Sequence, residues 1–375
     1  MTRAKLSYGL LTSQNQGGGN KKQGLAPSIG KGQYIFRILS RKASHTEKEV
    51  EKEKEAVVLP VSTNQDGFLI KYSEGGDAQW FNTIKGTEDD SGYGIAVDSS
   101  NNIYLTGLYN STTPIDLGNG QTLPETTYDD VFLIKYSAGG VAQWFKTIKG
   151  TEDNYGYGIA VDSSNNIYLT GFYNSTTTID LGNGQTLPIS TDNDGFLIKY
   201  SAGGVAQWFN TIKGTEDDAG CGITVDSLDN IYITGRYNST TAIPLGNGKI
   251  LPASTNNTVD GFLIKYSDVG DAQWFNTIKG TGSDSGYGIA VDSFDNIYLT
   301  GLYNSTTPID LGNGKSLPET TNHDTFLIKY SAGGVAQWYK TIPGTEDDFG
   351  VGIAVDSLDN IYITGVYNSS TTIVL

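Results

Sequence analysis

The chain has 375 residues, a net charge of −16, 48 glycines, one cysteine, one methionine and two histidines. It contains no run of about eighteen apolar residues, which excludes a transmembrane helix of ordinary length. The single Cys221 excludes an intrachain disulfide framework and a zinc site built from cysteines. Turn formers and β-branched or aromatic residues abound, so the composition indicates an all-β chain.

Charge divides the chain at about residue 60. Residues 1–60 contain eleven Lys or Arg and five Glu, a net charge of +6. Residues 61–375 contain fourteen Lys or Arg and thirty-six Asp or Glu, a net charge of −22. We predict a basic, Gly- and Lys-rich, partly disordered extension over 1–60, with a short charged helix at 45–57. The acidic body should repel nucleic acid and anionic membranes. No signal peptide opens the chain, so we expect a cytoplasmic protein, or a virion-associated one if it is viral.

A tryptophan phrase recurs through the body and sets the length of a repeat. Each copy reads AQW followed by Phe or Tyr, and the copies lie 64, 64, 66 and 64 residues apart. This period exceeds the roughly 40–50 residues of a typical propeller blade and excludes heptads and collagen. The tryptophans are Trp80, Trp144, Trp208, Trp274 and Trp338.

Each repeat is predicted to contain four strands. In the first complete repeat these are GIAVD from Gly94, NIYLTGLYN (102–110), VFLIKYS (131–137) and AQWFKTI (142–148). Short Ser, Asn and Gly connections join the first pair and the second pair, as in hairpins. Hydrophobic residues on both faces of the strands favour sheets that are covered on both sides by neighbours.

The two ends of the repeat array are complementary halves of one unit. The array begins with third and fourth strands at 67–73 and 78–84, and it ends with first and second strands at 352–356 and 360–368. Joining the halves removes open sheet edges. We therefore predict a closed, monomeric five-bladed β-propeller over 61–375. Its units are 86–149, 150–213, 214–279 and 280–343, with a closing blade formed by 67–85 plus 344–375.

These phrases resemble a known family. DGFLIKYS, GYGIAVDSSNNIYLTG and IDLGNGQTLP are similar to the bacterial β-propeller repeat family called SBBP, over residues 66–375. The resemblance implies a propeller fold and implies no particular reaction. The segment NQGGGNKKQGL in the extension also resembles N-terminal segments of proteins from large DNA viruses of protists, which would make the extension an attachment or packaging tag.

Acidic loops between the blades are the candidate ligand-binding site. They read GTEDD, GTEDN, GTEDD, GTGSD and GTEDD, and strand alternation places them at one mouth of the ring, beside the loop of roughly twenty residues that joins the second and third strands. A ring of acids focuses electrostatic potential toward a cation or a basic partner; the alternative is that acidic loops keep the propeller soluble. The candidate residues are Glu88, Asp89, Asp90, Glu152, Asp153, Glu216, Asp217, Asp218, Asp284, Glu346, Asp347 and Asp348.

Other motifs favour structural roles. His323 lies in a loop without a nucleophile motif beside it, and Cys221 takes the place of Tyr or Val in other repeats, so it is predicted to pack. The Asp98 to Asn102 turn resembles a calcium loop but lacks its central Gly and its bidentate Glu. Recurring Asn-Ser-Thr sequons accept glycans only in a eukaryotic secretory route.

Three classes of function compete. Near-identical repeats argue against an enzyme, because a catalytic site needs different residues in different roles. We therefore predict a non-catalytic interaction or structural module without cofactor or metal, which presents its acidic loop face to a partner protein or cation. The alternatives are a carbohydrate-binding propeller that uses exposed aromatic rings, and a metal-assisted hydrolase or lyase that uses the acidic ring. No partner is identified by the sequence.

Overall fold

The computed structural model of the chain describes residues 57–62 and 64–373. The predicted extension at 1–60 and its charged helix thus lie almost entirely outside the described residues. The chain divides into two compact units, and every described strand belongs to the one that contains residues 59–375. The described residues form only β-strands, turns and irregular segments, which confirms the all-β prediction.

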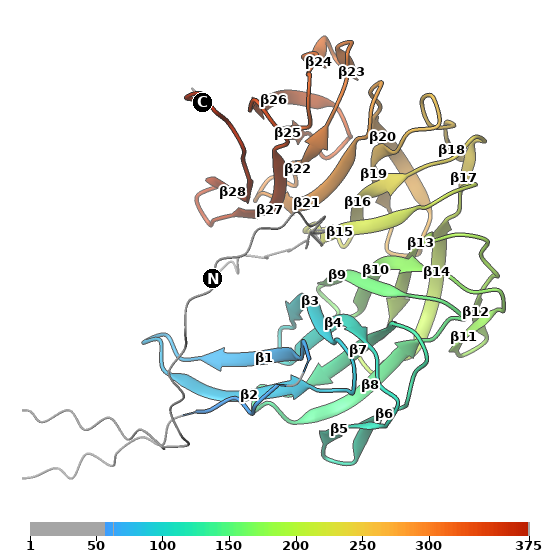
Figure 1. Cartoon of the computed structure of the whole chain (residues 1–375), viewed down its shortest axis with the longest axis vertical. Helices are drawn as coiled ribbons and strands as arrows, with labels where there is room; N and C mark the ends of the chain where they lie inside the picture. The colour runs from blue at the N-terminus through green and yellow to red at the C-terminus, as the bar shows by residue number, and fades with distance from the viewer. Residues whose placement is uncertain (1–56, 63, 374–375) are drawn as a thin grey trace, which may run out of the picture. The chain divides into compact units, whose positions relative to one another are not determined.

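Four complete blades make up most of this unit. Each is a four-stranded antiparallel sheet, and the first strands of successive blades lie side by side around a common centre (Figure 1). The strands are, in chain order, β3 (Ser91–Val97), β4 (Ile103–Tyr109), β7 (Asp130–Tyr136) and β8 (Ala142–Ile148); β9 (Tyr155–Val161), β10 (Ile167–Tyr173), β13 (Asp194–Tyr200) and β14 (Ala206–Ile212); β15 (Ala219–Val225), β16 (Ile231–Tyr237), β19 (Asp260–Tyr266) and β20 (Ala272–Ile278); β21 (Ser285–Val291), β22 (Ile297–Tyr303), β25 (Asp324–Tyr330) and β26 (Ala336–Ile342).

The two end hairpins are separate two-stranded sheets. The first contains β1 (Gly67–Tyr72) and β2 (Ala78–Ile84), and the second contains β27 (Phe349–Val355) and β28 (Ile361–Val366). Among the described residues no ladder joins β28 to β1, and the blue and red hairpins stand apart in Figure 1. The structure therefore confirms repeated four-stranded, propeller-like blades, whereas no strand pairing among the described residues joins the two end hairpins, so ring closure stays a prediction.

The hydrophobic core lies between neighbouring blades. One cluster combines Tyr104 and Leu133 of the first complete blade with Leu169 and Phe196 of the second, and Trp144 packs against it. The second strand of each complete blade is buried almost throughout because blades cover it on both faces. Burial on both faces explains why these strands carry hydrophobic residues without alternation.

A short hairpin follows the second strand of each complete blade. The sequence predicted only a loop there, but residues such as Ile115, Leu117 and Leu123 are buried in the inter-blade core. Asn119, at the tip of the first hairpin, donates to the Ala142 carbonyl at the start of β8 (2.8 Å), so the hairpin runs along the outer strand of its blade. The hairpins are β5 (Ile115–Gly118) with β6 (Gln121–Leu123), β11 (Ile179–Gly182) with β12 (Gln185–Leu187), β17 (Ile243–Gly246) with β18 (Lys249–Leu251), and β23 (Ile309–Gly312) with β24 (Lys315–Leu317).

Candidate functional site

The acidic inter-blade loops lie at one end of the blades, as the sequence predicted. Each loop joins the outer strand of one blade to the first strand of the next, and it is fixed to the exit of the second strand of that next blade. The Glu216 amide, for example, donates to the Asn238 carbonyl (3.2 Å), and Thr215 and Thr240 share a hydrogen bond between hydroxyls (3.1 Å). These contacts recur from repeat to repeat, so the loops have a defined conformation.

The last residue of each loop is buried and holds the loop in place; it is an aspartate in four loops and Asn154 in the fifth. Asp218, 1% exposed, accepts hydrogen bonds from the backbone amides of Gly214 and Asn238, the latter at 2.9 Å. Burial outweighs these hydrogen bonds and raises the pKa of Asp218 to about 8. The same cause raises the pKa of Asp284 to about 8 and that of Asp90 to about 7. A buried carboxyl that keeps its proton near neutral pH is a poor cation ligand.

The aspartate at the fourth position of the loop also has a local partner. Asp89 accepts a hydrogen bond from the Gln65 amide (3.0 Å), and Asp347 accepts one from the His323 amide (3.1 Å). The His323 ring nitrogen lies 3.0 Å from Asp347 as well, and although burial opposes it, hydrogen bonds from His323 lower the pKa of Asp347. The equivalent residues Asp153 and Asp217 accept from the preceding loop in the same way.

The glutamates are the candidate residues whose carboxylates extend into solvent. Glu88, Glu152, Glu216 and Glu346 are exposed at equivalent loop positions, and the described hydrogen bonds of these residues involve their backbone groups. No group of three or more His, Cys, Asp or Glu among the described residues is arranged to hold a metal ion. The structure thus separates the candidate acids into three groups: buried aspartates that hold their loops, aspartates that accept a hydrogen bond from a neighbouring loop, and four exposed glutamates. Ligand binding by any of these acids stays a prediction.

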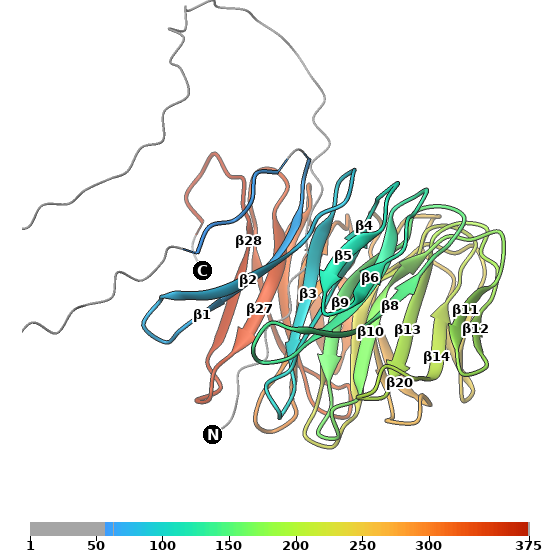
Figure 2. The same ribbon diagram turned by 90° about the horizontal axis from the view of Figure 1, so that it is seen from below.

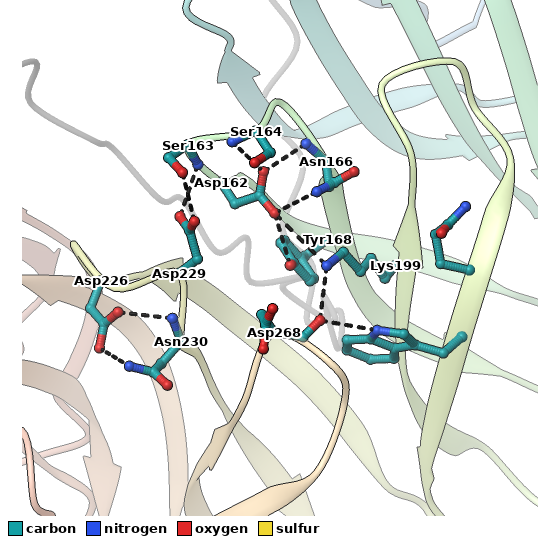
Figure 3. Close-up of polar contacts among 12 residues, drawn as sticks. Asp162, Ser163, Ser164, Asn166, Tyr168, Lys199, Asp226, Asp229, Asn230 and Asp268 are labelled. Atoms are coloured by element: carbon teal, nitrogen blue, oxygen red, sulfur yellow. Dashed lines mark hydrogen bonds and ion pairs between the residues drawn. The ribbon is translucent and has the colours of Figure 1, made fainter.

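At the opposite end of each blade, an aspartate organises the turn between the first two strands (Figure 3). Asp162 accepts from the amides of Ser164 (3.0 Å) and Asn166 (2.7 Å), and from the Tyr168 hydroxyl (3.0 Å). The Lys199 ammonium lies 3.9 Å from the same carboxylate and 5.2 Å from the centre of the Tyr168 ring. These donors account for the aspartate at this position without a calcium ion.

Lysine and tryptophan side chains join each blade to the next at this end. Lys199 and the Trp208 indole nitrogen both donate to the Asp268 carbonyl of the following blade, at 2.8 and 3.2 Å (Figure 3). The Trp208 ring covers Gly270, where a Cβ would approach the ring to 3.0 Å. The repeated tryptophans therefore pack between blades, as the strand pattern indicated.

A cavity of about 650 Å³ opens beside these turns, among the first strands of the blades. Its walls are mostly apolar and include Ile159, Val161 and Ile223, and Asp162 and Asp229 also line it. Sequence reasoning missed this cavity because it placed the charged mouth at the other end of the strands. The sequence does place an aspartate at the end of each first strand, and this recurring position was the available signal for a feature at this end of the blades.

Cys221 is buried between aromatic rings rather than exposed in a reactive site. It is 5% exposed and packs with Phe172, Tyr157 and Tyr287. Burial raises the pKa of its thiol despite the nearby Arg236 cation, so the thiol stays protonated at neutral pH. This environment fits the packing role predicted from the residues that replace it in other repeats.

Comparison with known proteins agrees with this architecture. The family model described as "Beta-propeller repeat" (SBBP) matches residues 79–112, 143–171, 273–306 and 337–369, so these four segments are similar to that repeat. The segment around Trp208, which precedes Cys221 and Arg236, is not among these matches although it forms the same strands.

Two curated proteins are similar to the chain. An uncharacterized WD repeat-containing protein of Acanthamoeba polyphaga mimivirus is 28% identical over 84% of this chain and 27% of its own length. The source of this relative is a large DNA virus of an amoeba, which agrees with the resemblance of the segment NQGGGNKKQGL to proteins of such viruses. The regulatory protein FlaEY of Caulobacter vibrioides is 25% identical over 56% of this chain and 23% of its own length. The chain thus spans about a quarter of each relative.

Solved structures give weaker likenesses. A Bacteroides caccae protein of unknown function is 7% identical, with a TM-score of 0.35 over 80% of this chain and 94% of that protein. The periplasmic gluconolactonase of Pseudomonas aeruginosa is also 7% identical, with a TM-score of 0.35 over 81% and 97%. Among the described residues of the present chain, no helix has the length and hydrophobicity that a bilayer crossing requires.

Proposed function

We propose that this chain is a non-catalytic interaction module, a closed five-bladed ring that presents the exposed loop glutamates to a basic partner protein or a cation. The observation that carries the proposal is the recurrence of Glu88, Glu152, Glu216 and Glu346 as exposed side chains on rigid, equivalent loops. Equivalent charges on a ring act together on one ligand. The relative named for WD repeats supports an interaction role, since it is 28% identical over 84% of this chain.

Support for closure comes from faces that are buried in the complete blades and open in the end hairpins. Tyr362 of β28 is 59% exposed, whereas the equivalent Tyr104 is fully buried. Phe68 of β1 is 60% exposed, whereas the equivalent Phe132 is fully buried. Pairing the two edges would cover both residues and remove a template for aggregation.

A second support is the joint that links blades. Trp80, Trp144, Trp208 and Trp274 each cover a positive-φ glycine of the next hairpin. Gly76, in the β1–β2 turn, has a similar φ of 82°, and no atom lies within 4 Å of the position that its Cβ would take. We propose that Trp338 covers Gly76 in the closed ring. By analogy with the β4–β7 ladder, Ile361 would then pair with Tyr72.

Truncation tests closure. A chain that ends before residue 350 lacks the β27–β28 hairpin, so its blade edges stay open and we expect aggregation or unfolding. Unchanged solubility and an unchanged melting temperature would refute a closed ring.

Calorimetric titration with a polyamine or with calcium tests the acidic face. The variant Glu88→Gln, Glu152→Gln, Glu216→Gln, Glu346→Gln removes four charges and leaves the buried anchors intact. We expect it to give smaller binding heats than the wild type, and binding should weaken as salt rises. A control with Glu74→Gln, Asp268→Asn and Asp271→Asn changes exposed acids at the opposite end and should bind normally. Equal heats from all three proteins would assign the loops to solubility alone.

A further inference from the structure

Three consecutive turns expose a large hydrophobic side chain where two others carry serine. Leu228, Phe294 and Leu358 are 75%, 76% and 81% exposed at the third position of the turn between the first two strands of their blades. Ser100 and Ser164 occupy that position in the first two complete blades. Single exposed hydrophobic residues are common on proteins, but three equivalent ones on neighbouring blades form a patch.

The turn itself does not require a hydrophobic residue at this position. The backbone amide of Leu228 donates to Asp226 (2.9 Å), and the amide of Ser164 makes the same bond to Asp162 (3.0 Å). Either side chain is therefore compatible with the same turn. The hydrophobic side chains thus have no role in folding that the structure reveals.

A charge change accompanies the hydrophobic residues. The residue that follows is Asp229, Asp295 or Asp359 in the three hydrophobic turns, and it is Asn101 or Asn165 in the two serine turns. All five have a φ between 61° and 65°. Asparagine suffices for that conformation, so the three carboxylates add negative charge beside the hydrophobic side chains without being required by the turn.

The three turns are joined into one continuous surface. Ser227 donates through its amide and hydroxyl to Asp295 of the next turn (2.9 and 2.8 Å), and Ser293 donates in the same way to Asp359 (3.0 and 2.8 Å). Each of these serines immediately precedes a hydrophobic residue. The patch therefore has a fixed spacing, and it lies at the end of the first strands opposite the acidic inter-blade loops.

We infer that this surface, formed by the turns at 226–230, 292–296 and 356–360, is a docking site for a partner segment that is both hydrophobic and basic, such as an amphipathic helix rich in leucine and lysine. Hydrophobic side chains of the partner would cover Leu228, Phe294 and Leu358, while its cations would face the three carboxylates. Mixed hydrophobic and charge complementarity of this kind gives both affinity and orientation. The site is separate from the loop glutamates.

The repeats provide matched variants for a test in the full chain. Leu228→Ser, Phe294→Ser, Leu358→Ser copies the serine turns, and Asp229→Asn, Asp295→Asn, Asp359→Asn copies their asparagines, so both should fold. The probe is a fluorescently labelled synthetic amphipathic helix of leucine and lysine, and binding is followed by polarisation. We expect each triple variant to bind about tenfold more weakly, which corresponds to about 1.4 kcal/mol.

Further variants separate this site from the loop glutamates. The four glutamate-to-glutamine changes should leave probe binding unchanged, whereas Ser100→Leu with Asn101→Asp should strengthen it. Unchanged affinity in the Leu/Phe→Ser variant overturns the inference, and so does a loss seen only in the glutamine variant. If the Leu/Phe→Ser variant instead abolishes self-association of the chain without affecting the probe, the patch is a contact between copies and the inference fails.

Discussion

Replacing Asp218 by asparagine should change how the stability of the protein depends on pH. Asp218 is almost completely buried, and burial raises its pKa from 3.8 to about 8. The folded state therefore holds a proton that the unfolded chain releases above about pH 4. The second complete blade carries Asn154 at the equivalent position, where its side-chain oxygen accepts from the Asn174 amide (2.9 Å), so asparagine fits this site.

The sign and size of the effect follow from proton linkage. A raised folded-state pKa gives stability that is fully present below the unfolded pKa of 3.8 and is lost as pH rises toward 8. The loss is about 1.4 kcal/mol per pH unit for one group. Between about pH 5 and pH 7, Asp218 should thus lower the free energy of unfolding by up to about 3 kcal/mol. The asparagine variant lacks this contribution.

Urea unfolding followed by tryptophan fluorescence at about pH 5, 6 and 7 measures the effect. We expect the free energy of unfolding of Asp218→Asn to fall less over this range than that of the wild type. The exposed Asp217→Asn serves as a control and should follow the wild type. Parallel curves for wild type and Asp218→Asn would refute the conclusion that Asp218 is protonated in the folded protein.

Three further predictions concern the ring, the extension and the thiol. If the ring closes, Trp338→Ala and Trp274→Ala should each destabilise the protein by about 2 kcal/mol or more, and a much smaller drop in melting temperature for Trp338→Ala would contradict closure. Limited proteolysis should trim the chain to near residue 60 and leave a resistant body, so a protected extension would show that it packs. Cys221 should react with a thiol reagent only at the rate of unfolding, and rapid labelling in native buffer would contradict its burial.

Much of the fold could be predicted because its signals are local and repeated. The tryptophan period gave the repeat, and the Gly, Ser and Asn turns separated four strands in each. The short hairpins were missed although Ile115, Leu117 and Leu123 alternate around a Gly-Asn-Gly turn, which is a hairpin signal. Closure depends on two edges at opposite ends of the chain; the complementary half-repeats indicate it, but the pairing of the two edges has no local signal and stays a prediction.

The sequence could place the acidic loops at one end of the blades, but it could not predict which acid of each loop is buried and which is exposed. Adjacent acids in the sequence Glu-Asp-Asp look equivalent, and tertiary packing decides which one is buried. The loops contained a partial clue: the loop at 280–284 has lost its first two acids to Gly282 and Ser283 while keeping Asp284. A polar residue retained where neighbouring acids vary indicates a structural anchor, as Asp284 proves to be.

The joint between blades has a consequence for how such a protein changes during evolution. One half of the joint is the Lys and Trp pair of a blade, and the other half is the turn that contains the covered glycine, such as Gly270. Every complete blade carries both halves. An in-frame duplication of one repeat would therefore add a blade that fits its new neighbours on both sides, and deletion of one would leave a joint that still matches. Repeat number can thus drift by recombination while each interface is preserved.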